Sequence, residues 1–183
     1  MMHMGHEPER LRYADVSWLQ SEVVELPFYN STVAMYVVLP HKNVQLSYVE
    51  DQFSWNPKSL GLLYHRVKVS LPKFTAKKPT RLTAVLKALG INDLFARSTS
   101  NLTGIVHTEK PLWVGEVYHQ AYINVHETGT EASAATAVVF HTLGAAAPGG
   151  QKPIIEFVAN RPFLFFIWDR QTKTPLFNGR FLG

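Results

Sequence analysis

The chain has 183 residues, which is enough for one domain with a hydrophobic core. Hydrophobic residues make up 46% and charged residues 17%, a globular composition that excludes a disordered chain. The absence of cysteine excludes disulfide bonds and thiolate metal sites, and the net charge of +4 permits binding to acidic polymers without requiring it. The longest apolar runs are far shorter than a membrane-spanning helix, so we expect no membrane partner.

The first part of the chain predicts a buried hairpin. Residues 1–12 have no apolar core like that of a secretion signal. Residues 23–27 (VVELP) and 32–40 (TVAMYVVLP) are apolar, β-branched runs separated by a short turn, which indicates two strands of a buried sheet. Asn30 in that turn begins a glycosylation sequon, as does Asn101, although a hairpin turn explains the first equally well.

The middle of the chain predicts a strand between two helical segments. Residues 46–64 indicate a short, irregular helix limited by Pro57. Residues 67–74 (VKVSLPKF) alternate as a half-buried strand, with Lys68 and Ser70 on the polar face. Thr80 is then expected to cap a helix that Gly90 ends. The expected core face of this helix consists of Leu82, Val85, Leu86 and Leu89.

The same region is the most basic part of the chain. Its cations are Lys68, Lys73, Lys77, Lys78, Arg81 and Lys87. No aromatic, asparagine or glutamine residues interleave with them to make specific contacts, so a solvated face of strand and helix is favoured. We expect no binding of nucleic acid.

Residues 113–125 are rich in strand formers and lead into an unusual stretch, residues 127–151. This stretch has a glycine-broken start, an uncharged centre at 132–140 and a Gly/Pro-rich end, which together predict a long exposed loop. Written as a strand, one face holds only small or apolar groups: Thr130, Ala132, Ala134, Thr136, Val138 and Phe140. A flexible linker and a segment able to join a sheet both fit this composition.

The last part of the chain predicts another hairpin, formed by residues 157–167 and 175–181 around a turn at 169–174. Residues 163–168 (FLFFIW) form a continuous apolar run, as expected for a strand covered on both faces. Motifs of enzymes are absent, including G-x-S-x-G, H-E-x-x-H, the P-loop and G-x-G-x-x-G. The eight histidines have no useful spacing for a metal, so we expect no enzyme activity, no metal and no cofactor.

Five phrases in order resemble the serpin family of serine protease inhibitors. In chain order they are VSLPKF (69–74), LKALGINDLF (86–95), GTEASAAT (129–136), FVANRPFLFFI (157–167) and KTPLFNG (173–179). GTEASAAT is similar to the family's reactive-loop hinge, and FVANRPFLFFI is similar to its C-terminal signature. The resemblance extends from about Val23 onward and implies a partial serpin fold of class α+β, with mostly antiparallel β-sheets, a few helices and an exposed reactive loop.

The resemblance also implies a domain arrangement. Residues 1–183 are expected to be the C-terminal portion of a single serpin domain, with the reactive loop at about 127–152. The hinge would comprise Glu127, Gly129, Thr130, Glu131, Ala132, Ser133, Ala134, Ala135 and Thr136. His119 corresponds to a histidine of the family's shutter, which holds strands of the central sheet together. Its usual partners would lie in the other half of the family's sequence.

The activity implied is inhibition as a suicide substrate. Family spacing from Glu127 places the scissile bond between Leu143 and Gly144, which suggests chymotrypsin-, elastase- or cathepsin-like proteases, serine or cysteine, as partners. The segment 144–152 is longer than in most of the family, so Phe140 or a later bond are alternatives. The family also implies an extracellular location and, for the basic region, a weak glycosaminoglycan interaction. The alternative function is a non-inhibitory binding or carrier protein, or a truncated product without inhibitory activity.

Overall fold

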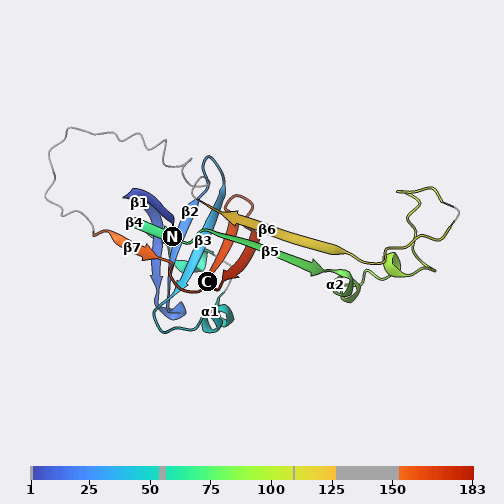
Figure 1. Ribbon diagram of the computed structural model, residues 1–183, viewed down its shortest axis with the longest axis horizontal. Coiled ribbons are helices and arrows are strands. Elements are labelled where there is room, and N and C mark those ends of the chain that lie inside the picture. Colours follow the sequence, from blue (N-terminus) through green and yellow to red (C-terminus); the bar gives the residue numbers. More distant parts are fainter. Residues whose placement is uncertain (1, 54–56, 109, 127–152) are drawn as a thin grey trace. The chain divides into compact units, whose positions relative to one another are not determined.

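The structure is a computed structural model that describes residues 2–53, 57–108, 110–126 and 153–183 (Figure 1). The chain forms two compact units, one of Met1–Lys73 with Val125–Gly183 and the other of Phe74–Asn124. The first unit contains β1 (Met2–Val16), β2 (Ser21–Pro27), β3 (Val33–Pro40), β4 (Leu63–Leu71), β7 (Ile155–Val158), β8 (Phe163–Asp169) and β9 (Thr174–Phe181). Its helical segments are η1 (Ser17–Leu19), α1 (Leu46–Gln52) and η2 (Pro57–Leu60).

The strands of the first unit form one seven-stranded sheet in the order β7-β4-β1-β2-β3-β8-β9. Its pairs are antiparallel, except that β7 runs parallel to β4. The predicted hairpin of residues 23–40 is confirmed as β2 and β3, paired from Ser21 with Pro40 to Pro27 with Ala34. The helical segment expected near Pro57 is present as α1 and η2. The strand pairs are mostly antiparallel and the helices are few and short, as the expected fold class requires.

The core lies where β3 and β8 pair. Tyr36 and Phe166 are register partners, and their rings stack with centroids 4.7 Å apart. Both residues belong to a cluster that also takes in Val49 of α1 and Leu60 of η2. On the other face of the same strands Val37 and Phe165 are buried as well. Of the apolar run 163–168, residues 163–166 are buried on both faces as predicted, whereas Ile167 and Trp168 are only half-buried.

Two predictions about this unit are corrected by the structure, and one strand is additional to those predicted. Residues 157–167 do not form one strand, because the chain leaves the sheet at Asn160–Pro162, where Pro162 has no N–H to give to a ladder. The two pieces separate widely, since β7 borders β4 whereas β8 lies between β3 and β9. The first residues, for which no strand was expected, form β1. Ser70, expected on the solvent face, is buried, although Val67, Val69 and Leu71 are buried as predicted.

The second unit contains β5 (Phe74–Arg81), α2 (Thr83–Ala88), η3 (Asp93–Phe95) and β6 (Tyr118–Val125), whose last residue belongs to the first unit. The prediction that Thr80 caps a helix is wrong: β5 continues through Thr80, and α2 has Leu82 as its N-cap, without a side-chain cap bond. No residue of α2 is buried, and Val85 and Leu89 are 51% and 74% exposed. Leu82 and Leu86 are half-buried, so the expected core face is only partly covered by the described residues. The strand predicted from residue 113 begins at Tyr118.

The basic residues are divided between the two units, with Lys68 and Lys73 in the first and the others in the second. Two of them stack on aromatic rings, which the sequence alone did not indicate. The guanidinium of Arg81 lies 5.6 Å from the ring of Tyr118, and the ammonium of Lys87 lies 5.4 Å from that of Phe95. These contacts give the two cations a role within the chain itself.

Gly179 offers a test of the packing between β8 and β9. A Cβ placed there would lie 2.6 Å from the ring of Phe165, which is buried and has little room to move. We expect Gly179→Ala to lower the free energy of unfolding by about 1–3 kcal/mol, as overpacked cores do. Gly115→Ala is the matched control, because nothing lies within 4 Å of its Cβ position. Equal chemical denaturation midpoints for both variants would contradict the pairing of β8 with β9.

Candidate functional site

The strand before the predicted loop, β6, has one partner, β5. Thr75 donates its hydroxyl to the side-chain oxygen of Asn124 over 3.0 Å, and Arg81 lies over Tyr118, so the start of each strand lies beside the end of the other. The two strands therefore run antiparallel. Among the described residues no strand pairs with the opposite edge of β6. Such an edge presents unpaired N–H and C=O groups to any strand that can reach it.

The residues immediately before β6 are fixed by contacts with the N-terminus of α2. The Leu82 N–H donates to the Val117 carbonyl over 2.9 Å, and the Val117 N–H donates to the Thr83 hydroxyl over 2.9 Å. That hydroxyl in turn donates to the Glu116 carboxylate over 3.0 Å. The Thr83 hydroxyl therefore holds the residues that lead into β6.

His119 lies near the start of β6. Side chains alternate along the strand, which puts His119 on the same face as Ala121, Ile123 and Val125. Those three are half-buried, whereas His119 is exposed. Its side chain has no hydrogen bond to another residue within the described parts of the chain. Its assignment to the shutter stays a prediction.

The strand after the predicted loop, β7, is bound to the large sheet. It pairs with β4 from Val67 with Ile155 to Ser70 with Val158. The side chain of Phe157 is fully buried, and the Ala159 N–H continues the pairing by donating to the Ser70 carbonyl over 2.9 Å. The chain beyond the loop is therefore anchored by both hydrogen bonds and apolar burial.

Arg161 fixes the connection between β7 and β8. Its Nε donates to the Pro40 carbonyl at the end of β3 over 2.6 Å, and its Nη2 lies 3.6 Å from the carboxylate of Glu22. Tyr13 of β1 donates its hydroxyl to the same carboxylate over 2.8 Å. The basic residue of the phrase FVANRPF thus ties the crossover to β3 and β2, and Tyr13 of β1 bonds the same carboxylate of Glu22.

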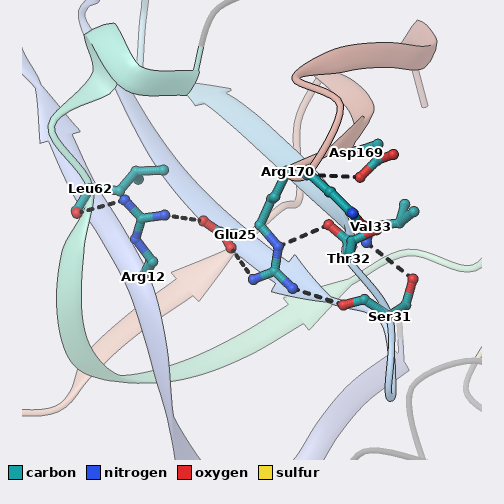
Figure 2. A network of polar contacts seen from close by, with 9 residues as sticks. Arg12, Glu25, Ser31, Thr32, Val33, Leu62, Asp169 and Arg170 are labelled. Carbon is teal, nitrogen blue, oxygen red and sulfur yellow. Dashed lines mark hydrogen bonds and ion pairs between the residues drawn. The ribbon is translucent and has the colours of Figure 1, made fainter.

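A second polar network surrounds Glu25 of β2, whose carboxylate is buried (Figure 2). Arg12 donates to one carboxylate oxygen over 2.9 Å and Arg170 to the other over 3.2 Å. Arg170 also donates to the carbonyls of Thr32 and Ser31, at 3.0 and 2.9 Å, so it joins the β8–β9 turn to the β2–β3 turn. Sequence reasoning missed this network. Its signal was a glutamate within the apolar run VVELP.

The β8–β9 turn has its own polar support. Asp169 accepts hydrogen bonds from the Thr172 hydroxyl over 2.8 Å and from the Gln171 N–H over 2.9 Å. These bonds, with that of Thr172 the largest cause, hold the pKa of the Asp169 carboxyl below its ordinary value. The carboxylate therefore stays ionised in the turn that carries Arg170.

Most of the predicted site lies outside the described residues. This applies to the scissile bond of Leu143 and Gly144 and to every predicted hinge residue, from Glu127 to Thr136. The two predicted glycosylation sites, Asn30 and Asn101, are both exposed. Asn30 lies in the β2–β3 turn with a φ of 47°. The side-chain oxygen of Asn101 accepts hydrogen bonds from the N–H and the hydroxyl of Thr103. Their glycosylation stays a prediction.

Metal ligands and membrane spans were sought in the described parts of the chain. No group of three or more histidine, aspartate or glutamate side chains is placed there to hold a metal ion. No helix in those parts has the length and apolar character needed to cross a membrane.

Comparison with known proteins identifies one family. A family model described as serpin (serine protease inhibitor) matches residues 1–183. The chain is 32% identical to mouse Serpin B11, over 99% of this chain and 46% of that protein. It is 31% identical to human leukocyte elastase inhibitor, over 97% of this chain and 48% of that one. The solved serpin of the trematode Schistosoma haematobium has a TM-score of 0.72 at 26% identity, over 97% of this chain and 45% of that structure.

These matches bear on three predictions. The family consists of protease inhibitors rather than enzymes, in agreement with the absence of enzyme motifs. The chain spans about half the length of the curated relatives it matches. The relatives give no support to the extracellular location that the resemblance implied.

Two buried tyrosines predict how stability depends on pH. Burial raises the pKa of Tyr13 and of Tyr36 well above the ordinary value of 10.0. The hydrogen bond to Glu22 raises the pKa of Tyr13 further, and the negative charge of Glu25 raises that of Tyr36 further. As pH rises, the two tyrosine hydroxyls lose their protons in the unfolded chain before they do so in the folded chain. Their contribution to the free energy of unfolding is therefore complete below about pH 10 and is lost as pH rises towards the pKa values of the folded chain. We expect the free energy of unfolding to fall above about pH 10, as measured by urea denaturation. The double variant Tyr13→Phe, Tyr36→Phe should show a shallower fall, and an unchanged slope would contradict the assignment.

Proposed function

The chain belongs to the serpin family, and we propose that it carries the reactive loop of a serine protease inhibitor that acts as a suicide substrate. We further propose that residues 1–183 correspond to the C-terminal portion of a single serpin domain, with the loop at about 127–152. The observation that carries the proposal is the position of the hinge phrase GTEASAAT, which follows closely after β6 and His126. A strand with an open edge thus leads directly into a segment suited to become a strand.

The sequence of the loop supports its role as an inserting strand. Thr130, Ala132, Ala134 and Thr136 would face inward on insertion and place no charge in the sheet. Gly129 would supply the joint at which the backbone changes direction. About ten inserted residues bonded on both sides would form roughly twenty main-chain hydrogen bonds at about 1 kcal/mol net each. This total is comparable with the stability of a whole domain and is sufficient to distort a bound protease.

The proposed chemistry is an interrupted proteolysis. The nucleophile of the protease attacks the carbonyl carbon of Leu143, and the peptide bond to Gly144 breaks as the Gly144 amine takes a proton and leaves. The residues before the cut are then joined to the protease as an acyl-enzyme. Insertion of the hinge before water attacks this ester or thioester would trap the protease on the inhibitor.

The target class follows from the residue before the cut. A leucine at that position suits chymotrypsin-, elastase- or cathepsin-like proteases. The name of the relative leukocyte elastase inhibitor agrees with an elastase-like target. His119 is proposed as the shutter residue of β6, where its exposed ring is accessible to a further strand. A weak glycosaminoglycan contact at the basic region is a subsidiary proposal.

The proposed scissile bond can be tested directly. Incubation of a complete serpin domain that contains residues 1–183 with chymotrypsin or with neutrophil-type elastase should give a complex that resists denaturing gel electrophoresis. Mass spectrometry should then find a released peptide that begins at Gly144. A peptide beginning after Phe140 would move the scissile bond to that position. Cleavage without any stable complex would favour the alternative of a non-inhibitory binding or carrier protein.

The hinge can be tested with a matched pair of variants. Thr136→Arg would put a charge on the face that insertion buries, at a cost of several kcal/mol if the charge is unpaired. Slower insertion lets water release the protease, so we expect this variant to be cleaved as an ordinary substrate, with little complex formed. Ser133→Arg, on the opposite face, should inhibit nearly as well as the parent. The ratio of complex to cleaved product measures the difference, and equal losses in both variants would refute the alternation.

A further inference from the structure

The strand after the predicted loop, β7, lies at one edge of the seven-stranded sheet, next to β4 and then β1 (Figure 1). The eleven residues from Gly144 to Ile154 join the proposed scissile bond to β7, and they span at most about 40 Å even if fully extended. A protease domain of about 240 residues is roughly 45 Å across. A protease bound at the loop is therefore close enough to contact the strands beside β7.

One face of these three strands is charged. Register partners lie on the same face of a sheet, and so do residues two apart along one strand. By this rule four charged residues share a face: Arg10 of β1, Arg66 and Lys68 of β4, and Glu156 of β7. The opposite face carries Val67 and Phe157, which are buried. We call the charged side, defined by Arg10, Arg66 and Lys68, the cationic face.

The cationic face contains an unfavourable pair. Arg10 and Arg66 are direct register partners, which brings two like charges together on Cβ atoms about 5 Å apart. The Arg10 guanidinium lies 5.1 Å from the ring of Tyr64, a contact that orders the arginine without neutralising it. Such a pair is destabilising by itself, so an anionic group placed beside it would relieve the repulsion.

The rest of the cationic face does not neutralise this charge. Lys68 is the register partner of Glu156, but neither side chain forms a hydrogen bond or an ion pair with a described residue. Three cations against one carboxylate leave a formal charge of +2. Arg10 and Glu156 are exposed, and Arg66 and Lys68 are half-buried, so groups from outside can reach all four.

The position of Glu156 bears on the kind of partner. A uniformly anionic polymer would meet this carboxylate beside Lys68 and be repelled by it. A folded protein can place acidic side chains on the cations and leave Glu156 in water or opposite a basic group. The mixed charges therefore favour a protein surface over a polyanion.

We propose that the cationic face is a second contact surface for the target protease, and that a protease which fits it carries acidic side chains beside its active site. The inference rests on the proposed function, because it concerns the protease that the loop would bind. The acidic groups bond Arg10 and Lys68 and relieve the repulsion between Arg10 and Arg66. Their attraction speeds the encounter of protease and loop.

The test compares one protease in two charge states. Chymotrypsin and chymotrypsin with succinylated lysines have the same active site, and the concentration of working enzyme is fixed by active-site titration. A complete serpin domain that contains residues 1–183 is the substrate, and the second-order rate constant of loop cleavage is normalised to that of a neutral peptide. We expect the succinylated enzyme to react at least about fivefold faster at low ionic strength. The advantage should vanish near 0.5 M NaCl, where the Debye length is about 4 Å.

Three single variants locate the effect. With the succinylated enzyme, Lys68→Gln should slow cleavage about two- to fivefold, and Glu156→Gln should speed it about twofold. Changes in opposite directions cannot come from a general loss of folding. Lys173→Gln is the matched control, because Lys173 is exposed in the β8–β9 turn, at the other end of the sheet from β7. It should leave the rate unchanged.

Three results would overturn the proposal. They are equal rates for the two forms of the enzyme, equal effects of Lys68→Gln and Lys173→Gln, and weaker retention of Lys68→Gln on a heparin column with unchanged cleavage rates. The last would assign the cationic face to a sulfated polysaccharide. Cleavage is measured whether it ends in trapping or in release of the protease, so a failure of inhibition would be seen separately.

Discussion

The structure depends on the pairing of β3 with β8. These strands are joined from Val33 with Asp169 to Val38 with Leu164, across more than half of the chain. Closing so large a loop has an entropic cost that grows only slowly with length, so the pairing can be stabilised by a modest number of buried residues. The stacked rings of Tyr36 and Phe166 and the apolar residues on both faces of the strands supply that burial. The strand β8, which follows the predicted loop, is thereby part of the main core.

The buried carboxylate of Glu25 shows how this core accommodates polarity. An isolated charge in such a place would be costly, and a single partner would offset only part of the cost. Glu25 has two arginine partners, Arg12 and Arg170, one on each carboxylate oxygen. Because Arg170 comes from the β8–β9 turn and Arg12 from β1, the network links strands that are not neighbours in the sheet, with β2 and β3 between them.

The elements that could be predicted from the sequence are those specified by local patterns. The runs VVELP and TVAMYVVLP are both apolar and close together, so β2 and β3 follow from neighbouring residues alone. The division of residues 157–167 into β7 and β8 was missed because both halves are apolar; only the partners, β4 and β3, distinguish them. Thr80 was wrongly predicted to cap a helix because it belongs to β5, whose partner β6 is far away in sequence. The hydrogen bond from the Leu82 N–H to the Val117 carbonyl extends this pairing beyond Thr80. The Glu25 network was missed for the same reason, since neither arginine partner is near Glu25 in sequence.

The two strands that border the predicted loop are held very differently, and this difference gives the proposed mechanism a direction. After the loop, Phe157 and the run from Phe163 to Phe166 are buried, and Arg161 ties their connection to β3. Before the loop, no residue of β6 is fully buried and its one described partner is β5. If the Leu143–Gly144 bond is cut, the residues after it stay anchored in the core. The freed end is then the one that follows β6, whose open edge is the first sheet position that the hinge can reach, so the protease would travel with the segment that is able to insert.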